Sequence, residues 1–114
     1  MAYKQDKISV SILKYVSDIL QFEVKSPDIG FITVTGVEVT NDLSYAKIFV
    51  SFLDKSKVNL RMEALERVKG FIRSSLAQKL TIRKVPTLIF VYDDSYEKGE
   101  KIEKILKEIK QKQD

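Results

Sequence analysis

The fold of this 114-residue chain is decided by residues 60–80, which read LRMEALERVKGFIRSSLAQKL. Their apolar side chains recur at helical spacing, at Met62, Leu65, Val68, Ile72, Leu76 and Leu80. Gly70 falls inside this stripe, where a glycine is about 1 kcal/mol less favourable than alanine. We therefore predict a helix that is interrupted at this glycine.

Upstream of this segment the sequence predicts one helix and two strands. Residues 4–24 carry one apolar stripe, and Pro27 ends that helix because the residue before a proline avoids the helical conformation. Residues 31–39 are rich in β-branched side chains, and their apolar alternation changes phase at Gly36, which predicts a β-bulge. A short turn follows, so the strand at residues 45–53 should return antiparallel.

Downstream, Pro86 precedes a short run of strong β-formers at residues 87–92. Residues 96–114 are rich in lysine and glutamate and predict a C-terminal helix with an apolar stripe at Ile102, Ile105, Leu106 and Ile109. The order of helix, strand, strand, kinked helix and strand predicts an α+β fold, with helices packed on a three-stranded mixed sheet. This order matches the topology of the type II KH fold.

Length and composition bound the class of protein. The 114 residues suit one domain with a single core, so we predict that residues 1–114 form a single KH-like domain. Hydrophobic residues make up 44% and charged residues 32% of the chain, which is typical of a globular protein. Cysteine is absent and no apolar run is long enough to span a membrane, so we expect a cytoplasmic protein with no membrane contact.

The sequence offers little for catalysis. It has no histidine, no cysteine and no glycine-rich phosphate loop. The acidic pair Asp93-Asp94 follows a strand and would suit a magnesium-dependent enzyme, but a turn that caps a helix is the simpler interpretation. We therefore expect no enzyme, no cofactor, no metal ion and no small-molecule substrate.

The positive charge is concentrated in one region. Residues 55–85 hold nine basic and two acidic residues, a net charge of +7, although the whole chain carries +4. Such a region on a small domain favours a polyanionic partner. The candidate RNA-binding residues are the cations of the interrupted helix and its exit loop, together with its glycine: Arg67, Lys69, Gly70, Arg73, Lys79, Arg83 and Lys84.

An ordinary solvated helix face is the alternative interpretation of this cluster. Acidic residues are absent between Arg67 and Lys84, so these cations should lack partners at i,i+4 spacing. Unpaired like charges repel one another, and a phosphate backbone would neutralise them. Phe71 lies off the main apolar stripe, and we expect it to pack in the core rather than to stack on bases.

Several segments resemble the bacterial ribosome-binding factor A family. They are FITVTGVEV at residues 31–39, DLSYAKIFVSF at 42–52, GFIRSSL at 70–76 and VPTLIFVYDDS at 85–95. They occur in the family's order and cover most of the chain. The pieces Asp-Leu-x-x-Ala-Lys and Pro-x-Leu-x-Phe-x-Tyr-Asp are specific in combination.

The resemblance implies a monomeric KH type II domain that binds 16S rRNA in free 30S ribosomal subunits. It implies a role in late maturation of the small subunit and in rRNA processing, above all in the cold, without catalysis. In the family a kink between two helices, marked Ala-x-Gly, replaces the Gly-x-x-Gly loop of ordinary KH domains. The matching triplet is Val68-Lys69-Gly70, so this chain departs from the family pattern at the first position.

A generic KH-like RNA-binding or protein-interaction module is the alternative function. Its partner would dock on the apolar stripe of the C-terminal helix. Packing of that stripe on the protein's own sheet is the simpler expectation, and the sequence alone leaves both open.

Overall fold

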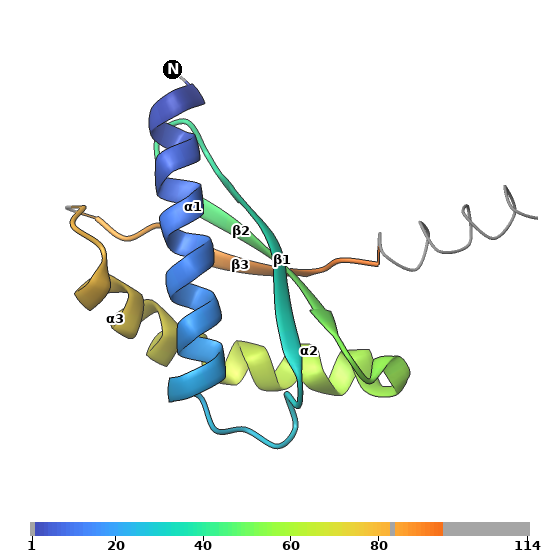
Figure 1. The fold of residues 1–114 in the computed structure, drawn as a ribbon. Helices are drawn as coiled ribbons and strands as arrows, with labels where there is room; N and C mark the ends of the chain where they lie inside the picture. The colour runs from blue at the N-terminus through green and yellow to red at the C-terminus, as the bar shows by residue number, and fades with distance from the viewer. Residues whose placement is uncertain (1, 83, 95–114) are drawn as a thin grey trace, which may run out of the picture.

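The computed structural model describes residues 2–82 and 84–94, and of residues 2–6 it describes the backbone (Figure 1). The elements in chain order are α1 (Ala2–Asp18), the π-helical turn η1 (Ile19–Glu23), β1 (Ile32–Val39), β2 (Tyr45–Phe52), the 3-10 turn η2 (Lys55–Lys57), α2 (Val58–Arg67), α3 (Lys69–Lys79) and β3 (Thr87–Tyr92). This order confirms the predicted α+β fold of the KH-like kind. The predicted helix at residues 96–114 lies outside the described residues.

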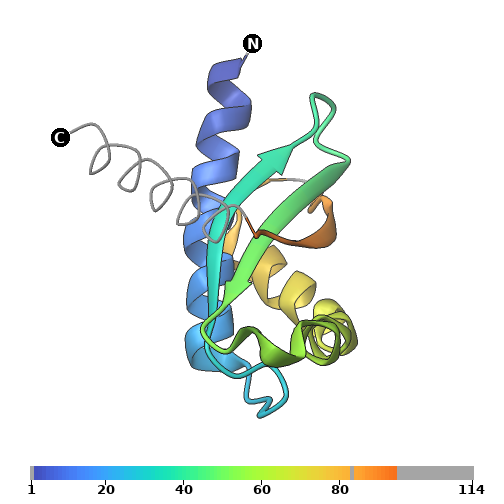
Figure 2. The ribbon, with the colours of Figure 1, turned by 90° about the vertical axis from the view of Figure 1, so that its right-hand side faces the viewer.

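The three strands form one mixed sheet in the order β1-β2-β3. β1 and β2 pair antiparallel, whereas β3 runs parallel to β2, so the α2–α3 unit carries the chain from one strand to the other. The register of β1 shifts between Val34 and Gly36, which confirms the bulge that the phase change predicted. Figure 2 shows the β1–β2 hairpin running alongside α1.

The core lies between one face of the sheet and the apolar sides of the helices. Alternate residues of β2 point into it, because side chains of a strand alternate between its two faces. Fully buried side chains come from α1, η1, β2, α2 and α3, and they include Ile12, Val16, Ile19, Ala46, Ile48, Val50, Leu65, Ile72 and Leu76. The other face of the sheet is uncovered by the described helices.

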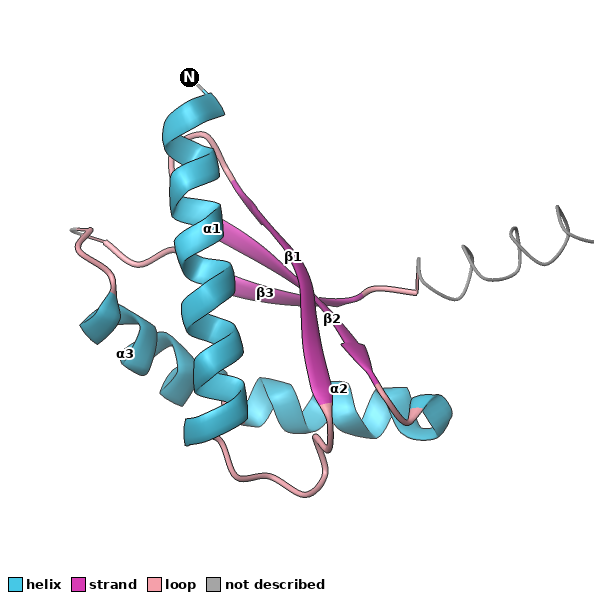
Figure 3. Ribbon diagram, viewed as in Figure 1, coloured by secondary structure: helices cyan, strands magenta, loops and turns pink. Residues whose placement is uncertain are grey.

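The helix at residues 60–80 is interrupted at Val68, two residues before the predicted point. Figure 3 shows α2 and α3 as two separate helices that run in different directions. Val68 has φ −100° and ψ 4°, which ends α2, and its side chain packs against the core. Gly70 lies in the first turn of α3 without a positive φ, and a Cβ placed there would meet nothing within 4 Å. The predicted interruption of the helix is therefore confirmed, but it lies at Val68, the first residue of the Val68-Lys69-Gly70 triplet, and not at the glycine.

Two further boundaries are set by local hydrogen bonds. The first helix ends where the Val24 N–H donates to the Ile19 carbonyl at 3.0 Å, three residues before Pro27. Between β2 and α2 the Asp54 side chain accepts the Ser56 N–H at 3.0 Å, which opens η2 directly before α2. Among the described residues no helix has the length and hydropathy to span a membrane.

Candidate nucleic-acid interface

One side of α3 and the chain that leads into β3 enclose an open groove of about 540 Å³, which we call the α3 groove. It is lined by Gly70, Arg73, Ser74, Ala77, Lys84 and Val85. The helical members are three or four residues apart, so they share one side of α3. Three of the seven predicted RNA-binding residues, Gly70, Arg73 and Lys84, thus meet in one place.

Arg73 is held in the α3 groove by backbone carbonyls. Its Nη2 donates to the Val85 carbonyl at 2.9 Å, and its Nε donates to the Pro86 carbonyl at 3.4 Å. A guanidinium has five N–H donors and keeps its charge at all ordinary pH values. Arg73 therefore retains a positive charge and further donors, and no described carboxylate forms an ion pair with it.

Lys84 supplies the second charge of the α3 groove, from the chain that leads into β3. Its side chain is exposed and, within the described part of the chain, forms no ion pair. No carboxylate lines the groove. The first turn of α3 adds the positive end of a helix dipole beside Gly70. The α3 groove therefore suits an anion such as a phosphate.

The remaining described cations of the cluster do have acidic partners, so the expectation that the cluster is unpaired is wrong. The pairs are Lys69 with Glu66 at 2.8 Å, Arg67 with Asp28 at 3.4 Å and Lys79 with Glu23 at 3.3 Å. Two of these partners, Asp28 and Glu23, are distant in sequence, so the i,i+4 spacing along the helix does not predict them. Exposed pairs of this kind contribute only about 0–1 kcal/mol each, so a phosphate can displace them.

Lys79 is absent from the lining of the α3 groove and belongs instead to a contact with η1. The Glu23 carboxylate accepts a hydrogen bond from the Ser75 hydroxyl at 2.7 Å and pairs with Lys79. Ser75 is only 7% exposed, and its hydrogen bond is the main reason that the pKa of Glu23 is lowered. Desolvation raises that pKa, and the contact with Lys79 lowers it further. This arrangement fastens the first helix to α3. Arg83 lies outside the described residues.

Arg61 belongs to the basic region by sequence, but the structure assigns it to the scaffold. Its side chain is only 12% exposed and pairs with the Asp54 carboxylate at 3.1 Å. It also donates to the Asp28 carbonyl at 3.1 Å, which ties the loop after η1 to α2. Gly30 has φ +64°, a conformation that other residues rarely adopt, so this loop favours a glycine.

Phe71 is the residue that sequence reasoning placed wrongly. It follows Gly70 in the first turn of α3, and 52% of it is exposed. The prediction of core packing failed because this position points away from the buried side of α3, which holds Ile72 and Leu76. The position of Phe71 off the apolar stripe was the sequence signal that could have predicted its exposure. An exposed aromatic ring beside a basic groove can stack on an unpaired base.

Asp93 is engaged in a structural contact. Its carboxylate accepts the Thr35 hydroxyl at 2.6 Å, and its N–H donates to the Val50 carbonyl at 2.8 Å. No group of three or more potential metal ligands occurs among the described residues. The predicted capping of a following helix by Asp93-Asp94 involves residues outside the described part.

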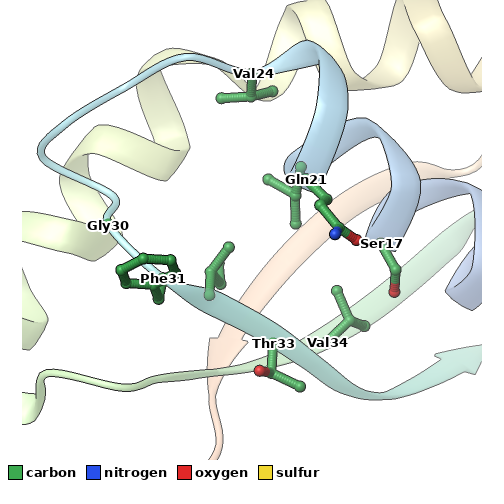
Figure 4. A pocket seen from close by; sticks show the side chains of 9 residues that line it. Ser17, Gln21, Val24, Gly30, Phe31, Thr33 and Val34 are labelled. Carbon is green, nitrogen blue, oxygen red and sulfur yellow. The ribbon is translucent and has the colours of Figure 1, made fainter.

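A second hollow lies between the end of the first helix and β1 (Figure 4). It is lined by Ser17, Leu20, Gln21, Val24, Gly30, Phe31, Ile32, Thr33 and Val34. None of these side chains is charged, so this hollow lacks what a polyanion requires. The α3 groove remains the candidate site.

The fold and the α3 groove together define a small KH-like α+β domain with a groove that holds two cations. A family model described as Ribosome-binding factor A matches residues 4–106. This match spans nearly the whole chain and reaches from α1 past β3. The chain belongs to the ribosome-binding factor A family.

Similar proteins agree with this assignment. The chain is 43% identical over 107 residues to ribosome-binding factor A of Natranaerobius thermophilus, covering 93% of this chain and 82% of the relative. It is 44% identical over 110 residues to that of Staphylococcus carnosus, covering 96% of each.

Two structures of the Thermus thermophilus protein share the fold. The crystal structure of its ribosome-binding factor A has a TM-score of 0.71 at 19% identity, over 77% of this chain and 93% of that one. A homology model fitted into a cryo-electron-microscopy map of a 30S complex of that protein has a TM-score of 0.64 at 20% identity, over 75% and 91%.

Proposed function

We propose that this protein is a non-enzymatic assembly factor that binds 16S rRNA in the free 30S subunit. It promotes late maturation of that subunit and processing of its rRNA, above all in the cold. Membership of the ribosome-binding factor A family supports a ribosomal partner, and the 30S complex of the Thermus thermophilus protein supports the small subunit. The protein acts as a cytoplasmic monomer without a cofactor, a small-molecule substrate or a membrane.

The observation that carries this proposal is the α3 groove, with two cations and no lining carboxylate. Arg73 and Lys84 bind phosphates of the rRNA backbone within the groove. Contacts of this kind position a protein without reading the base sequence, so specificity comes from the shape of the RNA. Since the backbone does not require a glycine at Gly70, the small size of this residue is what matters, because it lets a phosphate approach the helix backbone closely.

Action without catalysis agrees with the chemistry of the α3 groove. Its side chains are a guanidinium, an ammonium, a hydroxyl and small apolar groups. No histidine or carboxylate, the commonest general acids and bases, lines it. The protein therefore acts by occupying a site on the maturing particle.

Co-sedimentation with free 30S subunits and with 70S ribosomes at two salt concentrations tests the proposal. We expect binding to free 30S subunits that weakens at higher salt, and little binding to 70S ribosomes. Lys84→Ala should weaken 30S binding about threefold to tenfold, since it removes one phosphate contact. Lys25→Ala is the matched control, because Lys25 is also a surface lysine but lies outside the groove.

Two results would contradict this proposal. If Lys84→Ala and Lys25→Ala weaken binding equally, the α3 groove is not the interface. Binding that does not change with salt would instead favour the alternative, a module whose partner is a protein.

A further inference from the structure

The outer edge of β1 presents backbone groups that point away from the rest of the sheet. β1 lies at one edge of the sheet, and among the described residues only β2 pairs with it. The Leu53 N–H donates to the Phe31 carbonyl at 3.1 Å, so these two residues form a hydrogen-bonded pair of the antiparallel ladder. Such pairs alternate with non-hydrogen-bonded ones, so Ile32 and Val34 turn their N–H and C=O groups away from β2. A further strand can pair with groups of this kind.

The hollow between the end of the first helix and β1 lies beside these backbone groups (Figure 4). We call it the helix-side hollow, and its volume is about 530 Å³. Ile32 and Val34 line it from β1, whereas Ser17 and Gln21 line it from α1 and η1. η1 is a π-helical turn, and such turns are frequent at functional sites. Because its lining side chains are uncharged, this hollow suits an uncharged side chain.

A further hollow lies on the opposite face of the sheet, at the same part of β1. We call it the open-side hollow; its volume is about 460 Å³, and it is lined by Phe31, Thr33, Thr35, Ser51, Phe52, Leu53 and Lys55. Thr33 and Ser51 alternate with the core-facing residues of their strands, so this hollow lies on the face that the described helices leave uncovered. Phe31 is 80% exposed and Leu53 is 78% exposed. Large apolar side chains exposed together in this way indicate an interaction site.

The two hollows flank one strand edge, and this arrangement matches the side chains of an added strand. Phe31 and Thr33 line both hollows, so the hollows lie at the same level of β1. A strand paired with Ile32 and Val34 would lie about 4.8 Å from β1, and its side chains would alternate between the two faces. One side chain would therefore enter the helix-side hollow, and the next would reach over Phe31 into the open-side hollow.

We propose that the edge of β1 at residues 32–34 binds an extended segment of a partner protein, which adds a fourth strand to the sheet. The segment is uncharged where it pairs with β1, and it has apolar side chains at two adjacent positions, one for each hollow. Main-chain hydrogen bonds supply affinity in this mode of recognition, and the side-chain pockets supply specificity. The bulge between Val34 and Gly36 interrupts the regular edge and limits the paired stretch.

Two other occupants fit this edge less well. RNA binds largely through phosphates, and no cation lines the helix-side hollow to hold one. A second copy of the chain would present a β1 against which its own α1 is packed, so it is bulkier than a bare peptide segment. An extended, uncharged peptide segment has neither disadvantage.

A phage-displayed library of short random peptides tests the proposal, with the full chain as the target. We expect the peptides selected on the natural chain to share two adjacent apolar positions. Gln21→Trp fills the helix-side hollow and should weaken the affinity of a selected peptide about tenfold, as expected when the central pocket of an interface is blocked. Phe22→Trp is the matched control and should leave the affinity unchanged, because Phe22 is exposed and adjacent to Gln21 but does not line the hollow.

The open-side hollow is tested in the same way. Leu53→Ala removes its most exposed aliphatic side chain and should weaken the selected peptide about tenfold. Leu60→Ala is the matched control, because Leu60 is also an exposed leucine but lies in α2, outside both hollows.

Pairing through the backbone is tested on the peptide itself. The selected peptide is synthesised with N-methyl groups on one alternate set of its amides, or on the other set. Since only alternate amides of a paired strand face its neighbour, one form should lose binding and the other should keep it. This measurement uses the natural chain, so it decides the question even if Gln21→Trp disturbs the fold.

Three results would overturn the proposal. They are a selection that yields no peptide sensitive to Gln21→Trp, equal effects of Gln21→Trp and Phe22→Trp, and equal loss of binding in both N-methylated forms. A dimer of the natural chain that Gln21→Trp dissociates, as measured by light scattering, would overturn it in favour of a second copy. The experiments contain no RNA, so their outcome is independent of whether the α3 groove binds the 30S subunit.

Discussion

Arg73 and Lys84 share the α3 groove but differ in their contacts with the rest of the protein. Arg73 donates to two carbonyls of the chain before β3, whereas Lys84 has no ion pair among the described residues. Arg73→Lys keeps the charge and loses the two-carbonyl geometry, so the free energy of unfolding should fall by about 1–2 kcal/mol. Lys84→Ala should change it by less than about 0.5 kcal/mol. Thermal unfolding of both variants checks this, and equal effects would show that the bonds of Arg73 do not stabilise the fold.

Phe71 should contribute to binding without contributing to stability. Phe71→Ala should weaken binding to the 30S subunit by about 1–3 kcal/mol, the range measured for a base stacked on an aromatic ring. Because stacking involves no counterions, this loss should be the same at both salt concentrations. Phe22→Ala is the matched control, since Phe22 is also an exposed ring but lies in η1. A melting temperature lowered by several degrees in Phe71→Ala alone would indicate a packing role.

Glu23 should make stability depend on acidity. Hydrogen bonding from Ser75, followed by the contact with Lys79, lowers the pKa of Glu23 below its ordinary value of 4.5. Its contribution to stability is therefore present above that ordinary value and is lost as the pH falls through the lowered pKa of the folded state. Urea unfolding across this acidic range should show a shallower loss for Glu23→Gln than for the natural chain. Identical pH profiles would contradict the prediction.

At the scale of elements, the position of the break can be tested directly. Gly70 has helical surroundings and open space around it, so Gly70→Ala should stabilise the protein by about 0.5–1 kcal/mol. The reverse substitution Ala77→Gly, on the same side of α3, serves as the control and should destabilise the protein by a similar amount. Chemical denaturation measures both. A destabilising Gly70→Ala would show that the kink does depend on the glycine.

The elements also show what a sequence can and cannot predict. The bulge was predictable because a slip at Gly36 moves every following side chain to the other face, and the pattern records that slip. The break was misplaced because the apolar stripe continues through Val68 and looks the same on either side of it. In α3, the exposure of Phe71 was missed because periodicity identifies the buried side more clearly than it identifies exposed rings.

For the molecule as a whole, the sequence predicted the net charge of the basic region but not which of its cations form ion pairs with acidic residues. The net charge of residues 55–85 is +7 by sequence. Glu23 and Asp28 come from the chain around the end of the first helix, and only the fold brings them to Lys79 and Arg67. The residues of the α3 groove converge for the same reason, since the chain returns past α3 before it enters β3.

This distribution of charge sets the salt dependence of binding. Arg73 and Lys84, with one displaceable pair such as that of Arg67, can engage about three phosphates, so log affinity for the 30S subunit should fall against log salt with a slope of about −2. Lys84→Ala should make that slope shallower by about 0.7, because one fewer counterion is released. Arg67→Ala should have a similar effect only if its exposed pair with Asp28 opens on binding. Filter binding or co-sedimentation across a salt series measures these slopes. A slope near zero would mean that uncharged contacts dominate, and that the α3 groove faces solvent on the particle.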